Sequence, residues 1–268
     1  MKKTISILLF TIITAVCFAQ SHEYSFSEKY NVEVPAKFSI DLEDGNISVF
    51  SSNEPDIRVN FIAKINKKLI NIDRAELEKH FTIEIKKSQN SIKIFSKPTQ
   101  KENNKKWNKR IILSFEVMVP NTTSCNLYTV DGNISVKDLQ ANQKCKTVDG
   151  NIHLLSLKGI VTATTTDGNV SFRDIEGEFT AVSYDGNMSG SLSVLTENIS
   201  VSTRDGDIKV TLPKGLGLNL NLRGDEIDTN LKNFDGTIDD EYIKGKLNGG
   251  GISVDILTSD GDLSLDFK

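Results

Sequence analysis

Five aspartates recur at a nearly fixed spacing in the middle of the chain and are its first candidates for chemistry. The steps between them are 18, 18, 18 and 20 residues. If each step is one turn of a repeating structure, the carboxylates stack about 5 Å apart and repel one another unless solvent, hydrogen bonds or a cation relieve them. The repeated residues are Asp131-Gly132-Asn133, Asp149-Gly150-Asn151, Asp167-Gly168-Asn169, Asp185-Gly186-Asn187 and Asp205-Gly206.

Two interpretations of this aspartate ladder differ in what neutralises it. Ca²⁺ takes roughly six to eight oxygen ligands, which Asp, Asn and carbonyl groups supply. However, the spacing lacks the Gly-Gly-x-Gly-x-Asp pattern of calcium-binding β-rolls. Asp-Gly is also a tight-turn dipeptide, because glycine accepts positive φ and aspartate hydrogen-bonds its own turn. We therefore predict a structural corner with a stacked asparagine ladder and no cofactor, and Ca²⁺ is the alternative.

A basic segment from Lys97 to Arg110 is the second candidate. It contains the single tryptophan of the chain and one acidic residue, Glu102. A basic loop with an exposed aromatic ring suits an anionic glycan, lipid headgroups or nucleic acid. The alternative is a solvated charge run in which the tryptophan pins the loop. The predicted partner-binding residues are Lys101, Lys105, Lys106, Trp107, Lys109 and Arg110.

Cys125 and Cys145 are the third candidate. They lie six and four residues before their respective aspartates, so they have the same inward parity on neighbouring repeats. As diagonal neighbours their Cα atoms would be roughly 5.5–7 Å apart, which is within or near disulfide range. A disulfide and two independent buried thiols both remain open.

Catalytic motifs are poorly represented. The three histidines, His22, His80 and His153, lie far apart in the chain. There is no nucleophile elbow, no His-Glu-x-x-His motif and no phosphate loop. We therefore predict that the protein is not an enzyme, and a carbohydrate-active enzyme on the same fold is a third alternative.

The residues around each corner alternate in polarity and predict the elements that position it. Ile152, His153 and Leu154 show the apolar-polar-apolar pattern that follows the corner, which is typical of a strand with one buried face. Two residues before each aspartate is a Thr or Ser, a potential hydroxyl ladder. A second corner falls near Lys158-Gly159. The sequence thus predicts an all-β, single-chain, β-helix-like β-solenoid with coils of 18–20 residues and two or three strands per coil.

Three regions are expected along the chain. Residues 1–19 have the basic start, apolar stretch and small residues of a signal peptide, and a lipoprotein signal ending at Cys17 is the alternative. Residues 20–120 should form N-terminal coils and a cap, with a short helix after Asp73, a hairpin over 81–95 and the basic loop. Residues 121–268 should form the regular repeats and a C-terminal cap. No transmembrane segment is expected after signal cleavage.

The repeated Thr-x-Asp-Gly-Asn-Ile-x-Val corner resembles the bacterial putative-adhesin domain family, whose function is unknown. The phrases Leu247-Asn248-Gly249-Gly250-Gly251 and Thr258 to Leu263 point the same way. The resemblance implies an exported β-solenoid with an adhesive or envelope role.

From the residues and this resemblance we predict a non-enzymatic envelope protein that binds or scaffolds through its outward polar face. It would be located in the periplasm, at the outer membrane, on the cell surface or outside the cell. The expected partner is a surface glycan or another envelope protein, and nucleic acid is not expected. The alternative is a periplasmic envelope-stress or assembly component that acts through a protein partner.

Overall fold

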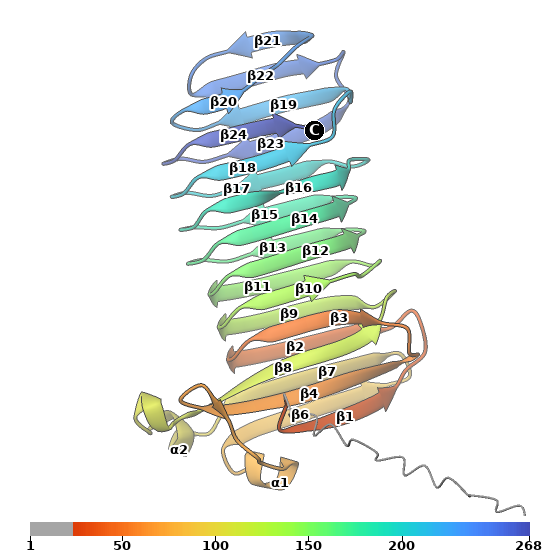
Figure 1. Ribbon diagram of the computed structural model, residues 1–268, viewed down its shortest axis with the longest axis vertical. Coiled ribbons are helices and arrows are strands. Elements are labelled where there is room, and N and C mark those ends of the chain that lie inside the picture. The colour runs from red at the N-terminus through yellow and green to blue at the C-terminus, as the bar shows by residue number, and fades with distance from the viewer. Residues whose placement is uncertain (1–23) are drawn as a thin grey trace, which may run out of the picture.

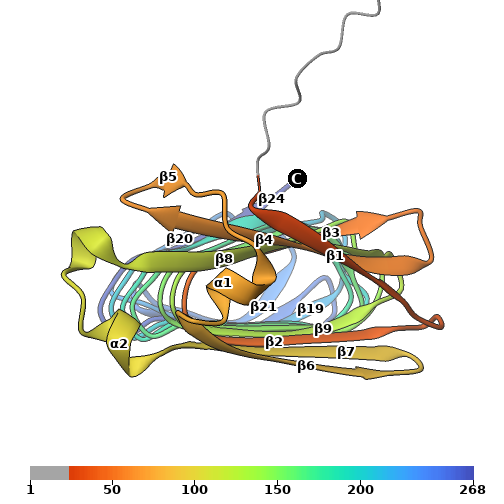
Figure 2. The same cartoon turned by 90° about the horizontal axis from the view of Figure 1, so that it is seen from below.

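A computed structural model describes residues 24–268, so the predicted signal peptide and His22 lie outside the described residues. The described chain is an elongated stack of flattened coils (Figure 1). Each coil contributes one strand to each of two sheets of 12 strands, and these sheets face each other across a thin core (Figure 2). This architecture confirms the predicted β-solenoid.

Sheet A includes the strands that follow the Asp-Gly corners, together with strands of the N-terminal region. In spatial order it contains β1 (Phe26–Asn31), β4 (Asp56–Ile65), β8 (Ile111–Pro120), β3 (Ile47–Ser52), β10 (Ile134–Lys137), β12 (Ile152–Lys158), β14 (Val170–Glu176), β16 (Met188–Val194), β18 (Ile208–Leu212), β24 (Leu263–Phe267) and β20 (Ile227–Thr229), with β5 (Lys68–Leu69) beside β4.

Sheet B includes the strands that precede the corners, together with antiparallel strands at both ends of the stack. In the same direction along the stack it contains β6 (Phe81–Ser88), β7 (Ser91–Pro98), β2 (Lys37–Asp44), β9 (Ser124–Asp131), β11 (Gln143–Asp149), β13 (Val161–Thr164), β15 (Phe179–Val182), β17 (Ile199–Ser202), β23 (Ile252–Leu257), β19 (Leu218–Arg223), β22 (Tyr242–Leu247) and β21 (Phe234–Ile238).

Equivalent residues of successive coils pair directly, in parallel. Ile134 of β10 pairs with Ile152 of β12, which pairs with Val170 of β14. All three side chains are fully buried. Because side chains alternate between the faces of a strand, each coil adds one apolar layer to a continuous core and one polar layer to the outside. The inward and outward residues predicted from the alternation therefore lie as expected.

The order of the coils in the stack differs from their order in the chain. The first coil, β2 and β3, lies between the later coils β7–β8 and β9–β10. The last coil, β23 and β24, is inserted between β17–β18 and β19–β20. Both ends of the stack are closed by antiparallel strands, which are β6, β4 and β1 at one end and β22 and β21 at the other.

The N-terminal elaboration covers one open end of the core. Helix α1 (Arg74–Leu77) begins after Asp73, whose carboxylate accepts a hydrogen bond from the Glu76 amide at 2.8 Å. Leu77 of this helix is fully buried. The helix lies over the opening between the two sheets (Figure 2). The hairpin of β6 and β7 follows. The short helix and hairpin predicted for this region are confirmed.

Two segments differ from what their local sequence favours. The stretch expected to be a polar loop between Lys97 and Arg110 contains helix α2 (Gln100–Asn103) and a 3₁₀-helix η1 (Trp107–Lys109), because Thr99 caps the first of them through the Glu102 amide. Residues 233–238 echo the Asp-Gly corner in sequence, but Phe234–Ile238 is the antiparallel strand β21. Within residues 24–268, no helix is long and apolar enough to cross a membrane.

Candidate functional site

The corner glycines are required by the closeness of successive coils. A Cβ atom built on Gly150 would lie 2.0 Å from the carbonyl oxygen of Gly132, and one on Gly168 would lie 2.0 Å from that of Gly150. Both distances are far shorter than an ordinary contact between non-bonded atoms. Only glycine lets the backbones stack this tightly, which is a different reason from the turn conformation inferred from the sequence.

The side chains next to these glycines hydrogen-bond from coil to coil. The buried Thr147 hydroxyl donates to the Gly132 carbonyl at 2.9 Å. The Asn133 side-chain oxygen accepts from the backbone amide of Asn151 at 2.8 Å. The same two contacts recur along the stack through Thr165, Ser183 and Thr203 and through Asn151, Asn169 and Asn187. The Thr or Ser and the Asn of each corner thus hold the next coil in register through their side chains, and the aspartates do so through their backbone carbonyls, as when the Gly150 amide donates to the Asp167 carbonyl at 3.1 Å.

The aspartate side chains lie at the outer edge of these corners. Hydrogen bonding to Asp205 raises the pKa of Asp260, and the bond from Asp260 lowers the pKa of Asp205. Desolvation, followed by a bond to Asp205, raises the pKa of Asp185. The opposite directions of these shifts indicate that neighbouring carboxyls at this end of the ladder interact. Within residues 24–268, no group of three or more His, Cys, Asp or Glu side chains is placed to hold a metal ion.

The basic segment is fixed to the solenoid by one buried carboxylate. Glu102 is only 1% exposed and accepts from the backbone amide of Ile111 at 2.8 Å. It also contacts His80 Nδ1 at 2.7 Å and Lys105 Nζ at 2.6 Å. Although burial opposes it, hydrogen bonding from Lys105, Ile111 and His80 holds the pKa of Glu102 below its usual value. A buried carboxylate with three donors is a structural anchor.

The contacts of this anchor separate the predicted partner-binding residues into those that hold the segment together and those that remain exposed. Lys105 is engaged with Glu102, and Arg110 donates to the carbonyls of Asn103 and Lys105. These two residues therefore hold the segment together. The side chains of Lys101, Lys106 and Lys109 are exposed, and Trp107 lies at the start of η1.

The two cysteines are both buried and free. Cys145 pairs across the sheet with Leu127, and Cys125 pairs with Gln143, so the thiols occupy the predicted diagonal positions. Burial raises the pKa of both thiols, that of Cys145 to about 12. Of the two alternatives drawn from the sequence, the structure contains the unbonded thiols.

His153 lies outward on β12, where its Nδ1 atom is 2.6 Å from the Ser171 hydroxyl of β14. Both residues are on the outer face of sheet A, in a row that also includes Ser135 and Ser48. His80 is the salt-bridge partner of Glu102 described above. Each described histidine therefore contacts a polar side chain. The two histidines lie far apart in the chain, since His80 directly precedes β6 and His153 lies in β12.

A groove on the outer face of sheet B unites residues that are distant in the sequence. It has a volume of about 340 Å³ and crosses β7, β2, β9, β11 and β13. Lys93 of β7, Lys37 of β2 and Lys144 of β11 line it. Between the lysines lie hydroxyl and amide side chains, namely Ser39, Ser91, Ser124, Asn126, Asn142 and Thr162.

The charges of this groove are available to a partner. Among residues 24–268, the ion pairs of the neighbouring strands involve Lys97 with Glu43 and Lys86 with Glu84, whereas Lys37, Lys93 and Lys144 take part in none. Two residues further along each strand is a second outward row with aromatic rings. There Lys146 Nζ lies 5.9 Å from the ring centre of Tyr128, and Phe95 is 39% exposed.

Sequence reasoning identified the outward polar face but missed this groove. Lys37, Lys93 and Lys144 lie on separate stretches of chain, and only the pairing of β2 with both β7 and β9 brings them together. The alternation of the hairpin over 81–95 indicates that Lys93 points outward. The sequence does not indicate where that hairpin lies in the stack of coils.

Comparison with solved structures gives distant similarities over nearly the whole chain. A putative adhesin from Bacteroides fragilis is 13% identical, with a TM-score of 0.45, and the alignment covers 90% of this chain and 96% of that one. A putative cell adhesion protein from Clostridium sporogenes is 15% identical, with a TM-score of 0.38 and coverages of 91% and 99%. A putative lipid binding protein from Parabacteroides distasonis is 11% identical, with a TM-score of 0.39 and coverages of 91% and 96%. No curated protein matches the sequence.

Comparison with family models gives one match that covers the regular part of the solenoid. The model of the Toastrack DUF4097 family matches residues 121–266, which is more than half of the chain and includes the Asp-Gly corners of the main array. The match confirms the family resemblance drawn from those corners. The chain belongs to the Toastrack DUF4097 family.

Proposed function

We propose that this protein is a non-enzymatic, exported binding protein that holds an acidic polysaccharide on the outer face of sheet B. The observation that carries the proposal is the groove in which Lys37, Lys93 and Lys144 surround a set of hydroxyl and amide groups and form no ion pair with any residue of the described part of the chain. Unpaired ammonium groups attract the carboxylate or sulfate groups of a glycan, and Ser, Thr and Asn side chains hydrogen-bond its hydroxyls.

The neighbouring row supports the same ligand class. Tyr128 of β9 and Phe95 of β7 present aromatic rings on the same face as the lysines, in register on either side of Asp41 of β2. Aromatic rings offer apolar contact area at low entropy cost, and the C–H face of a sugar ring is a suitable partner. Because outward rows continue along the stack, a polymer would contact several coils at once, and weak contacts would add.

The binding test uses an immobilised polyuronate and immobilised neutral dextran, with the full chain in solution at low and moderate salt. We expect binding to the polyuronate, weakening as salt rises, and little binding to dextran. The variant Lys37→Gln/Lys93→Gln/Lys144→Gln should lose about tenfold or more in affinity. The control Lys64→Gln/Lys137→Gln/Lys209→Gln changes the same net charge on sheet A. Equal losses in both variants would show general charge attraction and refute the groove.

Export is part of the proposal and is tested by protease treatment of intact cells, followed by detection of the protein in each fraction. Loss of the protein to external protease supports a surface role in adhesion. Protection until the outer membrane is broken contradicts direct adhesion and places any polysaccharide ligand inside the envelope.

The basic segment favours a second function, as a periplasmic assembly component that binds a protein partner. Glu102 fixes α2 and η1 beside the stack, where they project from its side (Figure 2). The exposed Lys101, Lys106 and Lys109 are thus held on an ordered support, which lowers the entropy cost of binding an acidic surface. Charge reversal of these three lysines should abolish capture of the partner and leave polyuronate binding intact. Loss of polyuronate binding instead would contradict a separate site.

A further inference from the structure

The two ends of the solenoid core are closed differently. At the N-terminal end, Phe26 stacks on Phe61 at 4.3 Å between ring centres, Phe61 contacts Phe115 at 5.0 Å, and α1 covers the opening. At the other end β20 is only three residues long and pairs with Leu263, Ser264 and Leu265 of β24. The remaining residues of β24, including Phe267, have no strand partner on that side.

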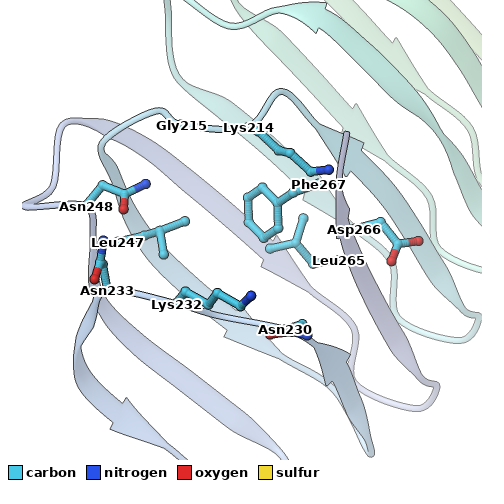
Figure 3. A pocket seen from close by; sticks show the side chains of 10 residues that line it. All are labelled: Lys214, Gly215, Asn230, Lys232, Asn233, Leu247, Asn248, Leu265, Asp266 and Phe267. Atoms are coloured by element: carbon cyan, nitrogen blue, oxygen red, sulfur yellow. The ribbon is translucent and has the colours of Figure 1, made fainter.

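This short strand leaves a cavity at the end of the core. The cavity has a volume of about 510 Å³, within the usual range of small-molecule sites, about 300–1,000 Å³. Figure 3 shows the side chains of Leu247, Leu265 and Phe267 turned toward its middle. Leu265 and Leu247 are nearly buried, whereas Phe267 is partly exposed. The full lining is Lys214, Gly215, Asn230, Lys232, Asn233, Leu247, Asn248, Leu265, Asp266 and Phe267.

The rim of the cavity is polar and mainly cationic. Lys214, from the loop after β18, and Lys232, from the loop after β20, lie on opposite sides of the apolar floor (Figure 3). Neither lysine forms an ion pair with a residue in the described range 24–268. The carboxylate of the lining belongs to Asp266 and points away from the middle of the cavity in the same view. The Asn248 side-chain amide donates to the Leu216 carbonyl at 3.0 Å.

We propose that this cavity binds a small amphipathic carboxylate, an acid with one anionic head and a flexible apolar chain. The apolar chain would lie against the partly exposed ring of Phe267, which Leu247 and Leu265, themselves nearly buried, border. The carboxylate would lie between the ammonium groups of Lys214 and Lys232. Charge complementarity selects an anion over a neutral or cationic amphiphile, and the exposed ring of Phe267 favours an organic acid over a bare inorganic anion. The site lies at the end of the stack and is separate from the sheet B groove.

The test is isothermal titration of the full chain with sodium decanoate, below the concentration at which it forms micelles. We expect saturable binding at one site, weaker binding of decanol and no binding of acetate or inorganic phosphate. The variant Lys214→Met/Lys232→Met keeps the apolar stems and removes both charges, so decanoate affinity should fall about five- to tenfold. Binding of decanol should be unchanged in this variant.

A matched control and a second variant locate the site. Lys64→Met/Lys209→Met removes two exposed charges on sheet A and should leave decanoate affinity unchanged, and circular dichroism checks that all variants fold alike. Phe267→Ser should weaken decanoate and decanol together, because both ligands use the apolar floor. The proposal is overturned if decanoate does not bind, if phosphate or acetate binds as well as decanoate, or if the two lysine pairs give equal losses.

Discussion

Replacing Gly150 by alanine tests the idea that close stacking, and not turn conformation, dictates the corner sequence. The added Cβ would lie 2.0 Å from the Gly132 oxygen and 2.6 Å from its carbonyl carbon. Relief requires the two coils to separate at the corner, which breaks the Thr147 bond to Gly132 and the Asn151 bond to Asn133. Two lost hydrogen bonds at about 1 kcal/mol each, together with roughly 1–3 kcal/mol for overpacking, give an expected cost of about 3–5 kcal/mol.

The assay is equilibrium unfolding in urea, followed by far-ultraviolet circular dichroism, with midpoints compared at a common slope. Gly215→Ala is the matched control, because Gly215 has a φ of +81° and a Cβ there would meet no atom within 4 Å. Gly215→Ala should lower stability only by the free energy needed to hold alanine in the left-handed conformation, about 1–2 kcal/mol. If Gly150→Ala costs no more than Gly215→Ala, the close approach of the coils is not what requires glycine, and the account of the corner fails.

Three further changes test other contacts of the stack. Desolvation, followed by the nearby Asp131 carboxylate, raises the pKa of Asp44 to about 6. The contribution of Asp44 to folding stability is therefore present below its unfolded pKa and is lost as pH rises through about 6. Asp44→Asn should raise stability at pH 8 by about 1 kcal/mol and change little at pH 4, as measured by urea midpoints at both pH values. Thr165→Val removes the 3.0 Å hydrogen bond to the Gly150 carbonyl and should cost about 1–2 kcal/mol of stability in the same assay. An unchanged stability would show that the ladder of hydroxyl groups does not stabilise the stack. Ile152→Asp places a charge at a fully buried position and should cost more than about 4 kcal/mol of stability. Val148→Asp, at a partly exposed position, should cost about 1 kcal/mol. Similar costs for the two variants would refute the assignment of inner and outer faces.

Local sequence was sufficient to predict the elements that pair with the neighbouring repeat along the chain. Alternation around each corner identified which side chains enter the core, since the parity of a strand is a property of the backbone alone. Asp73 marked the start of α1, because an N-cap needs only the amide three residues later. The ladder of Asp-Gly-Asn corners was visible because each coil pairs with the coil 18 or 20 residues away.

The same reasoning failed where pairing is not between neighbouring repeats. The sequence predicts a basic loop over residues 97–110, because it does not show that Glu102 is buried beneath His80 and Lys105 and fixes two short helices there. Asp235-Gly236 has the letters of a corner but lies in β21, because it pairs antiparallel with Lys246 and Gly245 of β22. A dipeptide that favours a turn yields to a strand when a partner strand satisfies its backbone.

The sequence by itself therefore determined the repeat, the two faces of each strand and the corner that joins them, since these follow from a spacing of 18–20 residues and a period of two. Only the tertiary structure decided the order of the coils. It placed β2 between β7 and β9, which assembles the lysine groove, and it inserted β23–β24 before β19–β20, which leaves the cavity beneath a short final strand. The physical reason is that every coil presents nearly the same edge, so the local pattern permits many stacking orders, and long-range packing at the two ends selects one.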